Sequence, residues 1–177
     1  MTAVIPIFNC ENSIKSSIRS IQNQNMSEIE ILLVNDLSKD NSLKIIEEMA
    51  INDSRIRIIN NKKNMGTLFS RCIGTLLARG NFVFPLDNDD LFIDYDLFDF
   101  VYRDIEKGNY DIIGFKAIQG HSYNKIHISE LIDDYFHDHP NNLIVNQPEL
   151  GLFSITKNKK FALNDIHIWG KCIIRLN

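Results

Sequence analysis

Short apolar runs alternate with stretches of helical periodicity over the first two thirds of the chain. Runs of about four to eight apolar residues between polar ones are typical of buried strands, whereas apolar residues spaced three and four apart are typical of helices. The pattern predicts strands at 3–8, 28–35, 55–60, 81–86 and 111–117, and helices that end at residues 21, 50, 78 and 107. This strand–helix repetition favours an α/β fold with a mostly parallel central sheet flanked by helices.

Local signals set the helix ends. Asn12 or Ser13 can cap the first helix and Asp40 or Asn41 the second, because short polar side chains bind the free N–H groups of a first turn. The third helix is expected at 67–78 and the fourth at 94–107. Gly80 then follows the third helix, close to the usual position of a glycine that ends a helix.

The periodicity weakens beyond residue 121. A capped helix is expected at 129–137, and irregular chain with one short strand at 141–160. No repeat or low-complexity linker divides the sequence. We therefore expect a single domain over residues 1–177, with a regular region at 1–117 and a less regular region at 118–177.

Composition narrows the class of protein. The 177 residues are 44% hydrophobic and 24% charged, which is typical of a globular domain. No apolar run approaches the roughly 20 residues of a membrane helix, and residues 1–6 lack the basic start of a signal peptide. The net charge of −4, without a basic face, argues against a nucleic-acid partner. Because Cys10, Cys72 and Cys172 lie far apart, we expect a cytoplasmic protein without a disulfide framework.

Polar residues directly follow three of the expected strands. These clusters are Asn9, the pair Asn35 and Asp36, and the acidic run at 87–90. In parallel sheets, ligands bind outside the carboxyl ends of the strands. We therefore expect the three clusters to meet at one edge and to form a ligand site.

The acidic run at 87–90 is the strongest candidate for chemistry. Its carboxylates repel one another unless a cation or hydrogen-bond donors neutralise them. Asp87 and Asp89 would share one side of an extended chain, and oxygen ligands in a loop suit Mg²⁺ or Mn²⁺ held together with substrate phosphates. The alternative is a solvated turn in which Asp90 caps a helix.

Other candidates are weaker on their own. Asp36 could accept hydrogen bonds from a ribose or a base, or could form an Asx turn before the next helix. Gly66 permits a left-handed turn, after which Arg71 would face an anion near the helix start or simply lie on the surface. A metal site at residues 137–139 (H-D-H) is disfavoured because no third ligand is near. Signature motifs of serine hydrolases, P-loop NTPases and dinucleotide-binding oxidoreductases are absent from the sequence.

In their order and spacing, these pieces resemble the family 2 glycosyltransferases, which have the Rossmann-like GT-A fold of nucleotide-diphospho-sugar transferases. The resemblance covers about the first hundred residues. It rests on segments 4–9, 18–24, 29–36, 38–42, 53–56, 64–66 and 70–71, on Gly74, and on residues 86–90 (L-D-N-D-D) at the position of the family's D-x-D motif.

The resemblance implies a nucleotide-binding role for several residues in region 1–117. Pro6 and Phe8 would frame the base, with Asn9 beside them in the substrate site. Asp36 would bind the base or the ribose, and Arg71 would approach the base or the diphosphate. The implied donor is a nucleoside-diphosphate sugar, and we expect a UDP-sugar.

The resemblance also implies a metal site. Asp89 would coordinate Mn²⁺ or Mg²⁺ that bridges the diphosphate, while Asp87 would help to hold the metal and the ribose, with Asn88 in the substrate site. The metal would neutralise the charge that develops as the sugar departs. The implied reaction is an inverting transfer to a glycan or lipid-linked acceptor in polysaccharide biosynthesis, and a peripheral association with a membrane stays open.

The sequence departs from the family in two places. Segment 166–175 resembles the tryptophan–lysine stretch that precedes the family's Glu-Asp pair, but the sequence ends at Asn177 before such a pair. The catalytic base is therefore unassigned, and region 118–177 is expected to be an incomplete acceptor side of a C-terminally truncated chain. The alternative is a catalytically impaired relative that only binds nucleotide-sugar. Leu37 stands where the family usually has glycine.

Two other α/β classes fit less well. A receiver-like domain would need an acidic pair after the first strand, where this chain has Ile7, Phe8 and Asn9. A nucleotidyltransferase would need a glycine-rich basic loop at 9–15, and the chain has none there.

Overall fold

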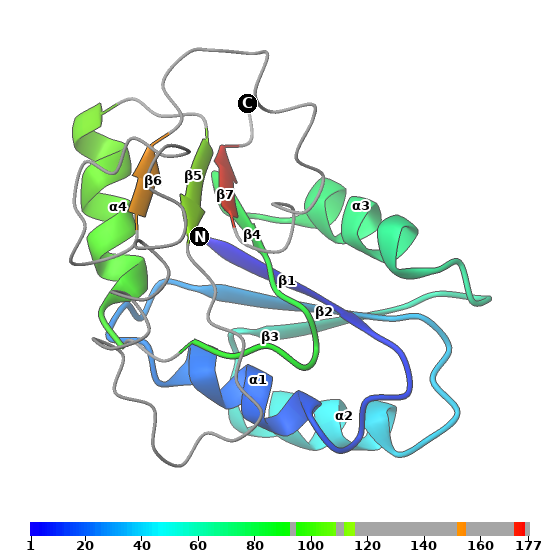
Figure 1. Cartoon of the computed structure of the whole chain (residues 1–177). Helices are drawn as coiled ribbons and strands as arrows, with labels where there is room; N and C mark the ends of the chain where they lie inside the picture. Colours follow the sequence, from blue (N-terminus) through cyan, green and yellow to red (C-terminus); the bar gives the residue numbers. More distant parts are fainter. Residues whose placement is uncertain (93–94, 109–111, 116–151, 155–171, 176–177) are drawn as a thin grey trace, which may run out of the picture.

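The computed structural model describes residues 1–92, 95–108, 112–115, 152–154 and 172–175 (Figure 1). Its elements are β1 (Thr2–Ile7), α1 (Ile14–Gln22), β2 (Glu30–Asn35), α2 (Ser42–Asn52), β3 (Ile56–Asn60), α3 (Thr67–Leu77), β4 (Phe82–Pro85), α4 (Leu97–Gly108), β5 (Ile112–Phe115), β6 (Leu152–Ser154) and β7 (Cys172–Arg175). The expected helix at 129–137 and the candidate metal ligands at 137–139 lie outside the described residues.

The strands form one sheet in the order β3-β2-β1-β4-β7-β5-β6. The first four are parallel, as predicted, whereas β7 pairs antiparallel with β4 and β5, and β6 pairs antiparallel with β5. Ile7 pairs with Asn35, and Asn35 pairs with Asn60, so β1, β2 and β3 end at the same level. This register brings the turns that follow these strands to one edge.

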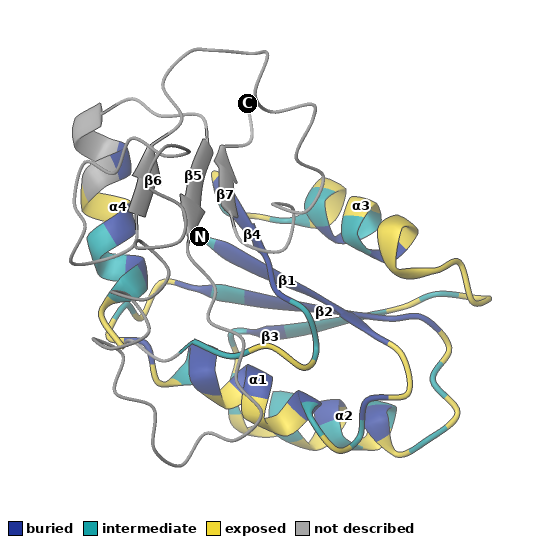
Figure 2. Ribbon diagram, in the orientation of Figure 1, coloured by how far each residue is buried: buried dark blue, intermediate teal, exposed yellow. Residues whose placement is uncertain are grey.

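Helices cover both faces of the sheet (Figures 1 and 2). On β1, Ala3, Ile5 and Ile7 face a large core that includes side chains of α1, α2 and α4. Val4 faces the opposite side, with Leu32, Val34 and Val83 beneath α3. Because parallel strands are buried on both faces, β1 is apolar at nearly every position rather than alternating.

Two glycines allow close packing around α3. A Cβ atom added at Gly74 would lie 2.2 Å from Cγ1 of Val4, so α3 packs directly on β1 at this position. The prediction that Gly80 ends the third helix is wrong, because α3 ends at Leu77 and Ala78 is already extended. Gly80 instead provides space for the chain start, since its added Cβ would lie 2.7 Å from the backbone carbon of Met1.

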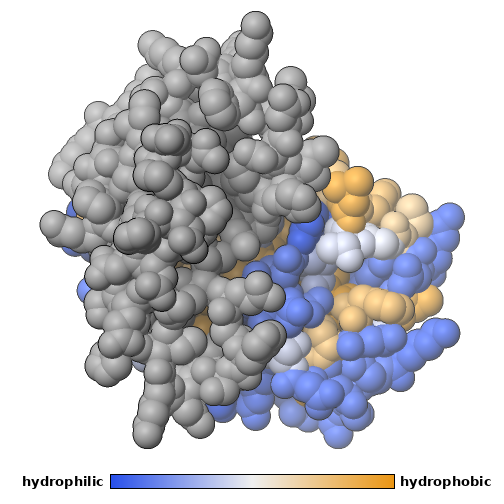
Figure 3. Space-filling model, viewed as in Figure 1, coloured by the Kyte–Doolittle hydropathy of each residue, from blue (hydrophilic) through white to orange (hydrophobic). Residues whose placement is uncertain are grey.

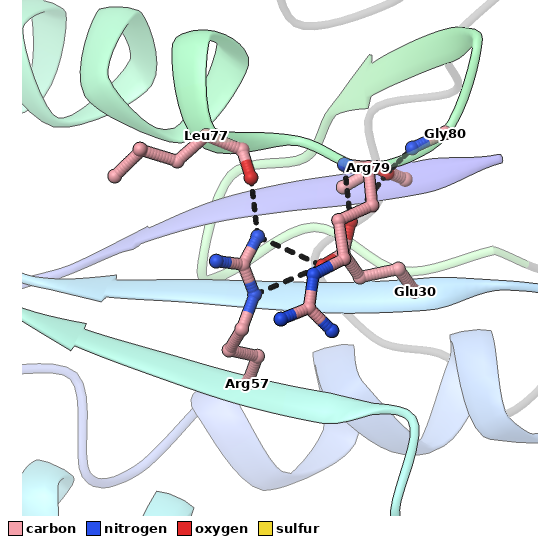
Figure 4. A network of polar contacts seen from close by, with 6 residues as sticks. Glu30, Arg57, Leu77, Arg79 and Gly80 are labelled. Atoms are coloured by element: carbon pink, nitrogen blue, oxygen red, sulfur yellow. Dashed lines mark hydrogen bonds and ion pairs between the residues drawn. The ribbon is translucent and has the colours of Figure 1, made fainter.

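A half-buried carboxylate, Glu30, joins the strands at the end of the sheet where they begin (Figure 4). One oxygen of Glu30 accepts from Nε of Arg57 at 2.9 Å, and the other accepts from Oγ1 of Thr2 at 2.7 Å and the N–H of Arg79 at 2.8 Å. Burial raises the pKa of Glu30, but these bonds outweigh burial and hold the pKa below its usual value. We call this set the Glu30 clamp; it joins β1, β2, β3 and the α3–β4 connection.

Candidate functional site

The three polar clusters meet at the carboxyl edge of the parallel strands, as the sequence predicted. Asp36 donates its N–H to the carbonyl of Ile7 at 2.8 Å, which joins the ends of β1 and β2. Asn88 donates its side-chain amide to the carbonyl of Pro6 at 3.0 Å, which brings the segment after β4 to the same place. Pro6 itself is buried within β1, and Asn9 is exposed at the edge.

Asp36 is buried, with 3% of its surface exposed, and is fully engaged with the loop after β3. One carboxylate oxygen accepts from the side chain of Asn61 at 2.7 Å and from the N–H of Met65 at 2.8 Å. The other accepts from the N–H of Gly66 at 2.7 Å. Burial raises the pKa of Asp36, but these hydrogen bonds outweigh it and lower the pKa below its ordinary value. Asp36 therefore stays charged and fixes loop 61–66.

Asp36 does not form the Asx turn that was the alternative interpretation; the two-residue bond of an Asx turn before α2 is made by Asp40, which accepts the N–H of Ser42. Asn35, the residue before Asp36, makes other bonds. The side-chain oxygen of Asn35 accepts the N–H of Ser38 at 3.1 Å, and its amide donates to Asn60 at 2.8 Å. Asn61 was not among the predicted site residues, although it supports Asp36. An amide directly after an expected strand is the signal that could have indicated it.

Arg71 forms an ion pair with Asp87 across two elements. Gly66 precedes α3 with φ of +87°, the left-handed conformation that the sequence predicted for it. Arg71 lies in the second turn of α3, and one of its terminal nitrogens bonds a carboxylate oxygen of Asp87, after β4. The guanidinium therefore neutralises part of the acidic run rather than lying free on the surface.

A donor remains unused beside this ion pair. The Nε of Arg71 is buried, and within the described part of the chain it has no hydrogen-bond partner. The whole side chain is only 20% exposed. A buried N–H without an acceptor is unfavourable, so this donor favours an anionic ligand at the site.

The rest of the acidic run forms a tight turn. The N–H of Asp90 donates to the carbonyl of Asp87 at 3.1 Å, and the carbonyl of Asn88 accepts from Oγ of Ser17 at 2.8 Å. Asp89 is exposed. The alternative that Asp90 caps a helix is wrong, because the next helix, α4, begins at Leu97.

The carboxylates of Asp87 and Asp89 are suitable ligands for a hard divalent cation. Asp87 and Asp89 offer oxygen ligands, and the side chain of Asp87 is 37% exposed. Among the described residues no third acidic, histidine or cysteine side chain joins them. Mg²⁺ and ions of similar chemistry are commonly held by one or two carboxylates, with water and phosphate oxygens completing the coordination.

Hydrogen bonds also lock the first two turns of this edge together. The side chain of Asp40 accepts the N–H of Glu11 at 3.0 Å and the N–H of Ser42 at 3.0 Å. Asn9 accepts the N–H of Lys39 at 2.8 Å through its side-chain oxygen. Burial raises the pKa of Asp40, but these bonds outweigh it and lower the pKa. The turns 8–13 and 36–41 therefore form one unit.

Solved structures place this architecture in a known class. S. aureus TarS (residues 1–349), which has also been solved in complex with UDP, matches with a TM-score of 0.61 and 25% identity, over 70% of this chain and 38% of that fragment. A mannosyltransferase from Pyrobaculum calidifontis, solved with GDP-Man and Mn²⁺, matches with a TM-score of 0.61 and 16% identity, over 66% of this chain and 35% of that one. The fold is therefore that of the GT-A glycosyltransferases.

Sequence relatives narrow the class to a family. The sequence model of glycosyl transferase family 2 matches residues 2–174, and the chain belongs to this family. It is 29% identical over 169 residues to the uncharacterized glycosyltransferase EpsJ of Bacillus subtilis, and 33% identical over 178 residues to the glycosyltransferase GlyA of Streptococcus pneumoniae. These alignments cover 96% and 97% of this chain, but only 45% and 24% of the relatives. Within the described residues, no helix is long and apolar enough to cross a bilayer.

Proposed function

We propose that this chain binds a nucleoside-diphosphate sugar, with a UDP-sugar as the donor, and transfers the sugar to a glycan or lipid-linked acceptor. One observation carries the proposal: Arg71 and Asp87 pair at the carboxyl edge of the sheet, where the Nε of Arg71 has no partner among the described residues. A cation and a carboxylate side by side, with a spare N–H donor, suit a diphosphate and its counterion.

The nucleotide would lie over the turns after β1 and β2. Phe8 is 43% exposed there and offers an aromatic face, and the exposed Asn9 bonds the turn after β1 to Lys39 in the turn after β2. Pro6 and Asn88 support this surface through their mutual hydrogen bond. The choice of UDP is supported by the likeness to TarS, which has been solved with UDP and with UDP-GlcNAc.

A divalent cation belongs to this proposal. Asp87 and Asp89 would hold Mn²⁺ or Mg²⁺, which would offset the negative charge on the leaving nucleoside diphosphate. Arg71 would add a second positive charge from α3, whereas the two aspartates follow β4. These residues orient the leaving group, and we propose that the acceptor attacks from the other face of the sugar with inversion. The expected setting is polysaccharide biosynthesis in the cytoplasm.

Binding without transfer is the second candidate function. Under the proposal, the site residues in the described region of the chain would all serve the donor side of the reaction. The general base remains unassigned. Release of UDP from a UDP-sugar in the presence of an acceptor separates the two candidates, because a chain that only binds the donor releases none above the buffer rate.

Calorimetric titration of UDP tests donor binding directly. Wild-type chain is titrated with and without Mn²⁺, beside Asp89→Ala and the control Asp99→Ala. Asp99 is an acidic residue of α4 that pairs with Arg103 on its own helix. We expect Mn²⁺ to tighten UDP binding in the wild type and the control but not in Asp89→Ala. Absence of UDP binding to the wild type under both conditions would refute the proposal.

A further inference from the structure

Leu37 combines two unfavourable features at the edge of the site. Its φ is +63°, in the left-handed region that non-glycine residues other than asparagine and aspartate rarely adopt. Its side chain is also 46% exposed, although it is apolar. Glycine would adopt this turn without strain and would expose no apolar surface. A strained and exposed leucine is therefore explained better by a ligand than by folding.

Two further exposed apolar side chains follow the neighbouring strands. Phe8 is 43% exposed and Met65 is 38% exposed. Hydrogen bonds of Asp36, the neighbour of Leu37, bring the three positions together. The N–H of Asp36 donates to the carbonyl of Ile7, the neighbour of Phe8, and the side chain of Asp36 accepts the N–H of Met65. Figure 3 shows apolar surface among hydrophilic side chains at the edge where β1, β2 and β3 end.

We propose that Leu37 is a donor-specificity residue, which with Phe8 and Met65 forms an apolar seat for the flat face of the nucleobase. The inference rests on the proposed function. The base is the occupant that the chemistry favours, because sugar and diphosphate are polar while a base has an apolar face and a polar rim. Arg71 in α3, whose Nε has no partner among the described residues, is available to meet the polar parts of the nucleotide.

The inference makes an unusual prediction for Leu37→Gly. The variant removes the strain of a positive φ and should unfold at a higher temperature than the wild type. It also removes the side chain, and we expect its affinity for UDP to fall about five- to tenfold. Leu37→Ala should lose affinity to a similar degree without the gain in stability, and Leu37→Met should keep most of the affinity.

The measurement is UDP and uridine binding by calorimetry, together with thermal unfolding, for all three variants. The control is Ile51→Ala, because Ile51 is 83% exposed near the end of α2, away from the site, and should leave UDP affinity unchanged. The losses at Leu37 should be equal with and without Mn²⁺ and equal for uridine, since the contact is with the base. If the wild type binds UDP and both truncations bind it equally well, the seat is refuted while the proposed function stands. If the wild type binds no UDP, both are refuted.

Discussion

Asp36 shows how one carboxylate can order a whole loop. Its two oxygens accept hydrogen bonds from the side chain of Asn61 and from the N–H groups of Met65 and Gly66. Gly66 is the residue from which α3 starts, so Asp36 also sets where that helix begins. The residue is thus a positioning group for loop 61–66. Because both oxygens are occupied and only 3% of its surface is exposed, Asp36 acts on a nucleotide site through this loop rather than by the direct contact with the nucleotide that the sequence had predicted.

Replacing Asp36 by asparagine tests the positioning role. One oxygen would become an NH₂ group facing an N–H donor, so a buried hydrogen bond would be replaced by two opposed donors. We expect Asp36→Asn to lower the free energy of unfolding by about 2–3 kcal/mol, measured by urea denaturation. UDP affinity should fall as well. Asp99→Asn on α4 is the matched control, and equal stability of the two variants would contradict the role.

Helix α3 is the element on which the site depends most. It brings Arg71 to Asp87, and its distance from the sheet is set by the contact of Gly74 with Val4. A second contact, at 3.2 Å from an added Cβ to Cγ2 of Val34, limits movement toward β2. The packing of α3 therefore determines the position of the guanidinium.

Gly74→Ala should separate α3 from the sheet. Overpacking of this kind destabilises by about 1–3 kcal/mol. Because Arg71 moves with the helix, we also expect weaker binding of UDP in the presence of Mn²⁺. Thermal unfolding and calorimetry measure the two effects. Cys72→Ala, on the exposed face of the same helix, is the control; a Gly74 variant that matches it in both assays would show that α3 tolerates the added methyl group.

At the scale of the whole molecule, hydrogen-bonded carboxylates set the response to acid. Glu30, Asp36 and Asp53 all have a pKa below the ordinary value. The shift is largest at Asp53, where two hydrogen bonds from the side chain of Arg55 and one from Gln22 lower the pKa from 3.8 to about 2. A group with a lowered pKa stabilises the fold above its unfolded value, and this stabilisation disappears as pH falls toward the folded value.

Asp53 should therefore contribute stability that is complete above about pH 4 and lost between about pH 4 and pH 2. We expect the difference in free energy of unfolding between the wild type and Asp53→Asn to shrink over that interval. Urea denaturation at several pH values measures it. Asp99→Asn is the control for an acidic residue on an exposed helix. The prediction would be contradicted if the difference in free energy of unfolding between the wild type and Asp53→Asn stayed constant down to about pH 2.

The sequence predicted the features of the molecule that depend on local patterns. The first four strands, their parallel arrangement and the meeting of Asn9, Asp36 and the acidic run follow from apolar periodicity and strand order. The antiparallel place of β7 was not predicted, because pairing between strands far apart in the sequence leaves no local signal. The same holds for the partners of Asp36 and Arg71, which come from other elements. The roles of Pro6, Phe8, Asn9, Asn88 and the metal ligands stay predictions.

The Glu30 clamp has a consequence for redesign of the protein. It fastens the strands at the end opposite the site, so the turns at the carboxyl edge can change without loosening it. Those turns are nevertheless bonded to one another through Asp36 and Asp40. To exchange one donor preference for another, loops 8–13, 36–41 and 61–66 should therefore be replaced together. A single replaced loop would lack the hydrogen-bond partners in the other two loops that fix its conformation.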